Sequence, residues 1–222
     1  MHIEKTKRLT LSAMMIAIAT ALALLCGLIP FLNLPFGGGF TIASMLPIVL
    51  ISYIYGVHWG LFSSLAYAVI QILLSLMGIG GSTVMMLFTP NSDDFMGYAA
   101  AIWIVLLDYL VAYTVLGLGG LFRNRIKSKS LSLCLGSVVA LTLRYLVHIV
   151  SGYIFYGAWA EWFFSQEGFA IGAHILDAVS GQWLALLYSV VYNGLYMLPE
   201  IVITAVVAVI VARIPQVRKV DF

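Results

Sequence analysis

Long apolar runs, separated by short polar stretches, make up most of this chain. A helix that spans a membrane needs about 20 mainly apolar residues. The pattern predicts six spanning helices, at about 9–29, 42–55, 59–77, 98–122, 131–156 and 184–212. Polar loops are expected at 78–96 and 159–183. Because no soluble segment or tandem repeat interrupts the pattern, residues 1–222 are expected to form one all-α domain, a six-helix transmembrane bundle.

The composition also indicates a membrane protein. Of the residues, 63% are hydrophobic and 9% are charged, whereas a soluble domain carries about 25% charged residues. The net charge of +2 is too small to indicate nucleic-acid binding. Cys26 and Cys134 lie inside apolar runs without CxxC or CxxH spacing, so we expect no metal, redox motif or cofactor. The first apolar run is too long for the core of a signal peptide, and we interpret it as the first span.

The positions of the charges predict the orientation. Lysines and arginines cluster at 5–8, 123–129 and 213–219, which account for ten of the eleven basic residues. Basic loops stay on the cytoplasmic side, and an even number of spans places all three clusters on one face. The acidic loop residues lie on the opposite face: Asp93, Asp94, Glu161, Glu167 and Asp177. Both termini are therefore expected in the cytoplasm.

Two charged residues lie in the middle of predicted spans. Asp108 is fourteen residues from the cytoplasmic end of the fourth span, and Arg144 is thirteen from that of the fifth. At about 1.5 Å per residue both lie roughly 20 Å above that end, so the two groups can be neighbours. A charge inside a span costs at least about 2.5–3.5 kcal/mol on insertion scales and should face a partner or a wet cavity. A buried ion pair that serves packing alone is the alternative.

Further polar and aromatic residues gather near this level. His148 follows Arg144 by one helical turn and shares its face. The remaining candidates are Tyr109, Tyr145, Tyr153, Tyr156, Tyr188, Tyr192, Asn193 and Glu200. Together they predict a small-molecule pocket in the outer half of the last three spans. The alternatives are a helix–helix hydrogen bond for His148, an interfacial position for Tyr188 and Tyr192, and capping of a kink after Pro199 for Glu200.

The chemistry of these side chains favours a ligand that is both cationic and aromatic. Aromatic rings stack on such a ligand, and its positive charge is attracted to the faces of the rings. A carboxylate supplies the counter-charge and accepts amino hydrogens. Asn193 can serve a ring nitrogen and a neighbouring amino group at once.

Small residues recur every four positions in the first span, at Ala13, Ala17 and Ala21. This spacing makes a flat face on which another helix can pack closely. A helix of the same chain and a helix of a partner are both compatible with it.

Four stretches of this sequence resemble the thiamine-specific substrate-binding (S) components of energy-coupling-factor (ECF) transporters. They are PFGGGFTIASMLPIVLIS (35–52), LLDYLVAYTVLGLGGLFR (106–123), LTLRYLVHIVSGYIFYGAWA (141–160) and YSVVYNGLYMLPE (188–200). The resemblance implies a protein of the bacterial plasma membrane that captures thiamine from outside. It also implies delivery through a transmembrane T subunit and two ATPase subunits of an ECF module.

The resemblance implies roles for single residues. The expected thiamine-binding residues are Asp108, Tyr109, His148, Tyr156, Tyr188 and Asn193. Additional candidates for the pocket are Arg144, Gly152, Trp159 and Tyr192. The alanines at 13, 17 and 21 match the stripe that docks on the T subunit.

The chain departs from the family pattern at several points. Some members have glutamate at the place of Asp108, tryptophan at that of Tyr156, and an aromatic residue where this chain has Gly37 to Gly39. The loop 159–183 is longer than expected, and its Trp159 or Trp162 can supply a stacking ring.

Three other functions are compatible with the sequence. One is transport of another amino-aromatic vitamin or of a thiamine precursor. A second is proton-coupled secondary transport through Asp108, His148 or Glu200. The third is an intramembrane hydrolase using Ser151 and His148, although no nucleophile elbow or oxyanion-hole signature accompanies them.

Overall fold

The computed structural model describes residues 2–34, 39–79, 83–167 and 169–218, and the described chain is helical apart from turns and an isolated bridge between Asn33 and Gly39. The elements before the fourth predicted span are α1 (His2–Gly27), η1 (Pro30–Leu32), α2 (Leu46–Tyr55), α3 (Val57–Leu76) and α4 (Thr83–Leu87). That span is one continuous rod of α5 (Tyr98–Ile104), η2 (Val105–Val111), α6 (Ala112–Thr114) and η3 (Val115–Gly120). The remaining elements are α7 (Lys129–Phe155), η4 (Gly157–Trp159), α8 (Ala160–Phe164), α9 (Gly172–Ala178), α10 (Gly181–Val211) and α11 (Pro215–Arg218).

Five helical stretches in the described residues are long and apolar enough to cross a membrane. They are Glu4–Gly27, Val57–Leu76, Tyr98–Gly120, Lys129–Phe155 and Gly181–Val211. Each coincides with a predicted span to within a few residues, apart from an N-terminal extension of the first. The chain is therefore a multi-pass, all-α membrane protein.

The second predicted span differs from the prediction. Residues 42–45 are not helical, and α2 has only ten residues, which rise about 15 Å, half the thickness of the hydrocarbon layer. Eight of its residues are buried, because α2 lies in the core between α1, α3, η3 and α7. Its unbroken apolar sequence reflects burial in protein on all sides.

The non-helical backbone before α2 is held by side chains. Glu200 of α10 is 1% exposed and accepts hydrogen bonds from the backbone N–H and from the hydroxyl of Thr41, the latter at 2.8 Å. The N–H of Ile42 lies 3.3 Å from the Cys26 sulfur. Irregular backbone at membrane depth is tolerated only where protein satisfies it. The described contacts of Glu200 thus serve this segment of the chain, a different role from capping the kink after Pro199.

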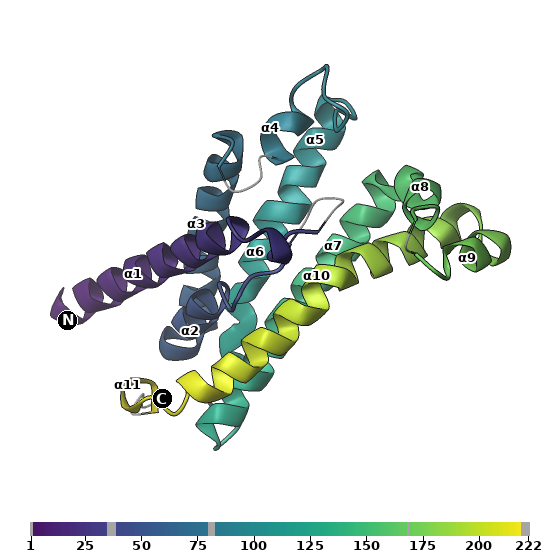
Figure 1. The fold of residues 1–222 in the computed structure, drawn as a ribbon. Coiled ribbons are helices and arrows are strands. Elements are labelled where there is room, and N and C mark those ends of the chain that lie inside the picture. The colour runs from purple at the N-terminus through teal and green to yellow at the C-terminus, as the bar shows by residue number, and fades with distance from the viewer. Residues whose placement is uncertain (1, 35–38, 80–82, 168, 219–222) are drawn as a thin grey trace.

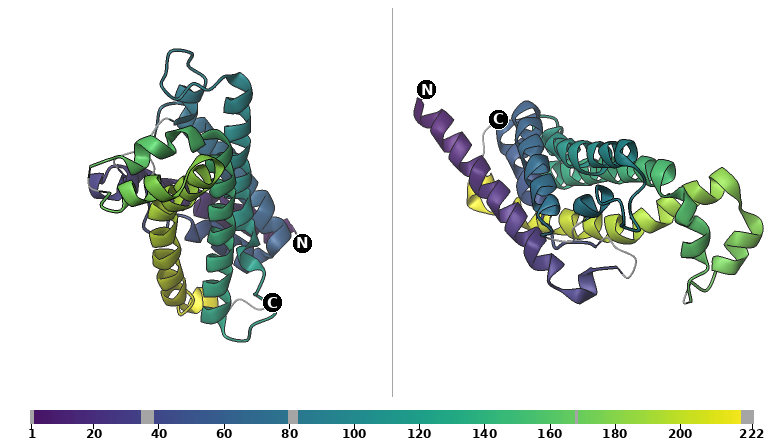
Figure 2. Two further views of the ribbon diagram at one scale, coloured as in Figure 1. Left: turned by 90° about the vertical axis from the view of Figure 1, so that its right-hand side faces the viewer. Right: turned by 90° about the horizontal axis from the view of Figure 1, so that it is seen from above.

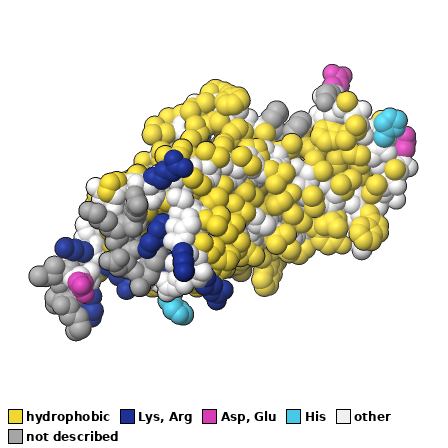
Figure 3. All heavy atoms as spheres, turned by 90° about the horizontal axis from the view of Figure 1, so that it is seen from below, with side chains coloured by type: hydrophobic (Ala, Val, Ile, Leu, Met, Phe, Trp, Pro, Cys, Tyr) yellow, Lys and Arg dark blue, Asp and Glu magenta, His cyan; other side chains and the backbone are white. Residues whose placement is uncertain are grey.

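Figures 1 and 2 show how the elements are arranged. α7 and α10 lie side by side along the molecule, and η3 packs against α2, α3 and α7. Both termini lie at one end, and α8 and α9 lie at the other. On the face in Figure 3, hydrophobic side chains cover the middle, and Lys and Arg gather at one end.

The two predicted polar loops contain helices that the sequence did not indicate. α4 lies in the first, and α8 and α9 lie in the second. Phe163 and Phe164 are buried with Leu184 and Tyr188 of α10. The described residues between Trp159 and Ser180 therefore form a cap that packs on α10.

Close backbone approaches fix the packing of η3. A Cβ on Gly136 of α7 would lie 1.9 Å from the carbonyl oxygen of Gly119. We expect Gly136→Ala to destabilise the protein by about 1–3 kcal/mol, because the clash outweighs the better helix propensity of alanine. Thermal unfolding in detergent measures this. Gly27→Ala is the matched control, since a Cβ there meets nothing within 4 Å; equal melting temperatures for the two variants would contradict the prediction.

Candidate functional site

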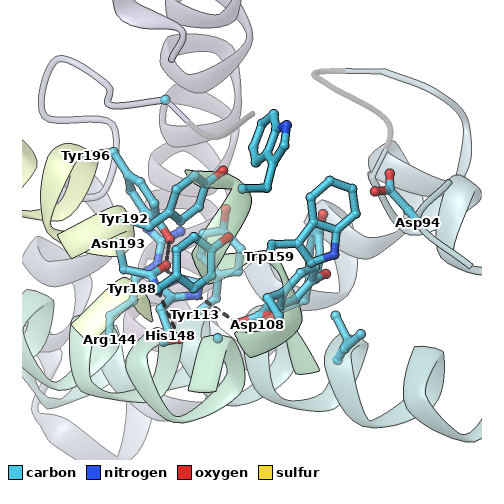
Figure 4. Close-up of a pocket in the computed structure, with 16 residues that line it drawn as sticks. Asp94, Asp108, Tyr113, Arg144, His148, Trp159, Tyr188, Tyr192, Asn193 and Tyr196 are labelled. Carbon is cyan, nitrogen blue, oxygen red and sulfur yellow. Dashed lines mark hydrogen bonds and ion pairs between the residues drawn. The ribbon is translucent and has the colours of Figure 1, made fainter. Parts of the chain in front are cut away.

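A cavity of about 380 Å³ opens between the fourth-span rod, α7, α10 and the cap (Figure 4). This volume is typical of small-molecule sites. The ten residues named above as binding residues or additional candidates all line it: Asp108, Tyr109, Arg144, His148, Gly152, Tyr156, Trp159, Tyr188, Tyr192 and Asn193. The lining also includes Gly39, Asp94, Ile104, Tyr113, Trp162 and Tyr196.

Asp108 is held by two side chains of α7. Its Oδ1 lies 2.8 Å from His148 Nδ1, and its Oδ2 accepts a hydrogen bond from the Ser151 hydroxyl at 2.7 Å. Each carboxylate oxygen has two lone pairs, so each can accept one further hydrogen bond. Asp108 is therefore oriented by the protein and still able to accept from a ligand.

The hydrogen bonds indicate the state of His148. Arg144 Nε lies 3.2 Å from His148 Nε2, and because Nε of arginine always carries a hydrogen, Nε2 is the acceptor. Nδ1 then carries the ring proton and donates to Asp108. His148 is a neutral imidazole that joins the arginine to the aspartate.

Arg144 and Asp108 do not form the direct ion pair considered from the sequence. Among the described residues, the basic side chain within 4 Å of the Asp108 carboxylate is that of His148. The Arg144 guanidinium instead donates to the sulfur of Met45 and lies 4.3 Å from the centre of the Tyr113 ring. The two charges share one cavity but are separated by the imidazole.

Asp108 lies in a π-helical segment, which the sequence pattern did not indicate. The N–H of Ala112 bonds the carbonyl of Leu107, five residues earlier. A π-helix turns less per residue than an α-helix, which helps the consecutive Asp108 and Tyr109 face the same cavity. Such segments often occur at functional sites.

The α10 wall is built from tyrosines and Asn193. The Asn193 amide nitrogen donates to the carbonyl oxygens of Ser189 (2.8 Å) and His148 (3.2 Å), and its oxygen accepts from Tyr196. Asn193 therefore keeps only acceptor capacity for a ligand, less than the two-way pairing expected from its side chain. Tyr188 and Tyr192 lie with ring centroids 5.5 Å apart.

Several lining residues were not singled out from the sequence. Tyr113 follows Tyr109 by four residues, and Tyr196 follows Tyr192 by four, so helical periodicity was an available signal. Asp94 and Ile104 gave no such signal. Trp162 was named only as a ring that the long loop can supply, and it lines the cavity together with Trp159.

Three residues that the sequence suggested for the site do not have the expected role: Tyr145, Tyr153 and Ser151. The Tyr145 hydroxyl donates to the carbonyl of Val190 at 2.6 Å, and neither Tyr145 nor Tyr153 lines the cavity. Ser151 is fully buried and bonds Asp108 rather than His148, so it does not form the nucleophile–base pair with His148 that a hydrolase would use. Gly37 and Gly38 lie outside the described residues.

The alanine stripe of α1 is exposed in the isolated chain. Ala13, Ala17 and Ala21 all face away from the other helices. The stripe is therefore not an internal packing face.

Comparison with known proteins identifies the family. The family described as thiamine transporter protein (Thia_YuaJ) matches residues 13–89 and 92–166, well over half of the chain. The thiamine transporter ThiT of Bacillus subtilis (strain 168) is 29% identical over 218 residues, covering 93% of this chain and 93% of the Bacillus protein. Both are transporters rather than enzymes, which removes the support for an intramembrane hydrolase. The chain belongs to the thiamine transporter family.

Proposed function

We propose that this protein is the substrate-binding S component of an ECF-type vitamin transporter, and that it captures thiamine from outside in the cavity around Asp108. The observation that carries the proposal is the meeting of an oriented carboxylate with tyrosine and tryptophan rings in one cavity. A flat cationic ligand is stabilised both by the charge of the carboxylate and by stacking on the aromatic rings. Family membership supports thiamine as this cation.

In this proposal Asp108, Tyr109, His148, Tyr156, Tyr188 and Asn193 bind thiamine. Asp108 accepts hydrogens of the amino-pyrimidine ring with its remaining lone pairs. The tyrosine rings supply stacking faces on the α10 side of the cavity. Arg144, Gly152, Trp159 and Tyr192 complete the wall.

The proposed topology has six membrane-embedded helices, α2 being the short one, and both termini in the cytoplasm. The distribution of charge supports it, since basic side chains gather at one end of the molecule (Figure 3). The cavity then belongs to the outer half, with α8 and α9 on the extracellular side.

The energy for uptake comes from partners in this proposal: a transmembrane T subunit and two ATPases. The 222 residues contain no GxxxxGK[ST] sequence that would bind a nucleotide phosphate. The exposed stripe at Ala13, Ala17 and Ala21 supplies a flat surface for the T subunit.

Two measurements test the proposal. Thiamine should quench the intrinsic tryptophan and tyrosine fluorescence of the protein purified in detergent, and its isolated pyrimidine half should bind more weakly. Uptake of thiamine in cells should require the energising subunits. Vigorous uptake in cells that lack them would contradict the S-component function and favour secondary transport.

A further inference from the structure

Arg144 is the residue of the cavity wall whose presence the proposed function does not explain. It is 7% exposed and is the one Lys or Arg among the described residues that line the cavity. A guanidinium keeps its charge at every physiological pH, and burying it inside a span is costly. It also repels a cationic ligand in the same cavity. The contacts of Arg144 indicate what it contributes to binding.

The guanidinium is held with its Nε directed at His148. Nε lies 3.2 Å from His148 Nε2, while the far end of the group donates to the Met45 sulfur and lies 4.3 Å from the centre of the Tyr113 ring. Met45 precedes α2 and Tyr113 belongs to α6, so two other parts of the chain hold the arginine. On the other edge of the imidazole, Nδ1 lies 2.8 Å from Asp108 Oδ1, and Figure 4 shows His148 between the two charged groups.

Two charged groups control the protonation of His148. Arg144 of α7 and Asp108 of the fourth-span rod both contact its imidazole. The phenols on the elements around it are uncharged near neutral pH, and the remaining carboxyl group is engaged elsewhere. These groups are the phenols of Tyr109, Tyr113 and Tyr196, the last with its ring centroid 6.0 Å from the imidazole, and the carboxyl of Glu200, which is bonded to Thr41.

The contact at Nε2 decides the charge of the imidazole. Nε2 of the Nδ1–H tautomer has one lone pair, and the N–H of Arg144 already occupies it. A second proton there would also lie against a permanent positive charge. Without the arginine, Nε2 would be open to a second proton in mild acid. The resulting imidazolium would pair with Asp108 and cancel the negative charge that a cationic ligand needs.

We infer that Arg144 is a positioning residue that holds His148 as a neutral imidazole and thereby keeps the charge of Asp108 available to a cationic ligand in mild acid. This inference rests on the proposed function. The arginine acts through the histidine and does not itself need to touch the ligand. Capture of thiamine is then nearly independent of the external pH between about 5.5 and 8, although a histidine is part of the site.

The pH dependence of thiamine binding to Arg144→Met tests the inference. Methionine keeps a long unbranched side chain but has no N–H and no charge. The affinity of the variant, relative to that of the unmodified protein at the same pH, should fall about tenfold from pH 8 to pH 5.5. This is the loss expected when a histidine is about nine-tenths protonated, one pH unit below its ordinary pKa of about 6.5. Calorimetric titration in detergent measures the affinities, and the ratio cancels any titration of thiamine itself.

Two further variants are matched controls. Arg144→Lys retains a permanent cation with N–H donors, so it should restore the flat pH profile. In the double variant Arg144→Met with His148→Asn, the asparagine still offers an N–H to Asp108 but cannot take up a proton. Its affinity should be lower at every pH, without the additional loss in acid. A flat profile in Arg144→Met, or the same loss in acid in the double variant, would overturn the inference.

Nuclear magnetic resonance of the unmodified protein gives a test that depends on no variant of Arg144. With ¹⁵N-labelled histidine, His148 should show the neutral Nδ1–H tautomer at pH 5.5. The chain has four histidines, and the signals that disappear in His148→Asn identify this one. An imidazolium at pH 5.5 would overturn the role of Arg144 even if thiamine binds. Failure of the unmodified protein to bind thiamine would instead overturn the proposed function.

Discussion

Asp108→Asn should weaken thiamine binding by at least about tenfold while leaving the protein folded, since a hydrogen bond to a charged group is worth about 1.5–3 kcal/mol. The substitution removes the charge but preserves the size of the side chain. His148 Nδ1 and the Ser151 hydroxyl can still meet an amide oxygen, yet the amide nitrogen cannot accept. The ligand therefore loses both its counter-charge and an acceptor for its amino hydrogens. Equilibrium titration followed by intrinsic fluorescence measures the affinity.

Two controls keep this result interpretable. Thermal unfolding without ligand should change little, which separates lost binding from lost structure. Asp108→Glu restores the charge on a side chain longer by one methylene, so it should bind more tightly than Asp108→Asn. Unchanged affinity in Asp108→Asn would show that this carboxylate does not contact the ligand.

Ala17→Trp should reduce uptake by at least about tenfold without weakening thiamine binding by more than about twofold. Ala17 is at the centre of the exposed stripe on α1 and does not line the cavity. A large ring there prevents the close helix approach that small residues permit. The measurements are thiamine uptake in cells with the complete ECF module and binding to the purified variant.

The matched control is Val202→Trp, which places the same ring on an exposed position of α10. It should insert into the membrane and support uptake normally. Retained uptake in Ala17→Trp would contradict docking through the stripe. Loss of binding together with uptake would instead indicate damage to the fold.

The long helices could be predicted from the sequence because hydropathy over about 20 residues is a local property. The depth of Asp108 and Arg144 followed in the same way, since rise per residue is constant along a helix. The bounds and the burial of the second span could not be predicted correctly, because an apolar sequence is compatible both with contact to lipid and with burial inside the protein. The non-helical segment before α2 is bound by Glu200, which lies 159 residues from its partner Thr41.

What the sequence determined by itself is a membrane-embedded helical protein with a carboxylate, a histidine and several tyrosines at one depth. Only the tertiary structure decided which groups meet: His148 between Asp108 and Arg144, a π-helical turn at Asp108, and the rings of Trp159 and Trp162 in one cavity with Asp94. Periodicity and hydropathy concern neighbours along the chain. Contacts across helices depend on rotation, kinks and loop paths, which result from the packing of the whole bundle.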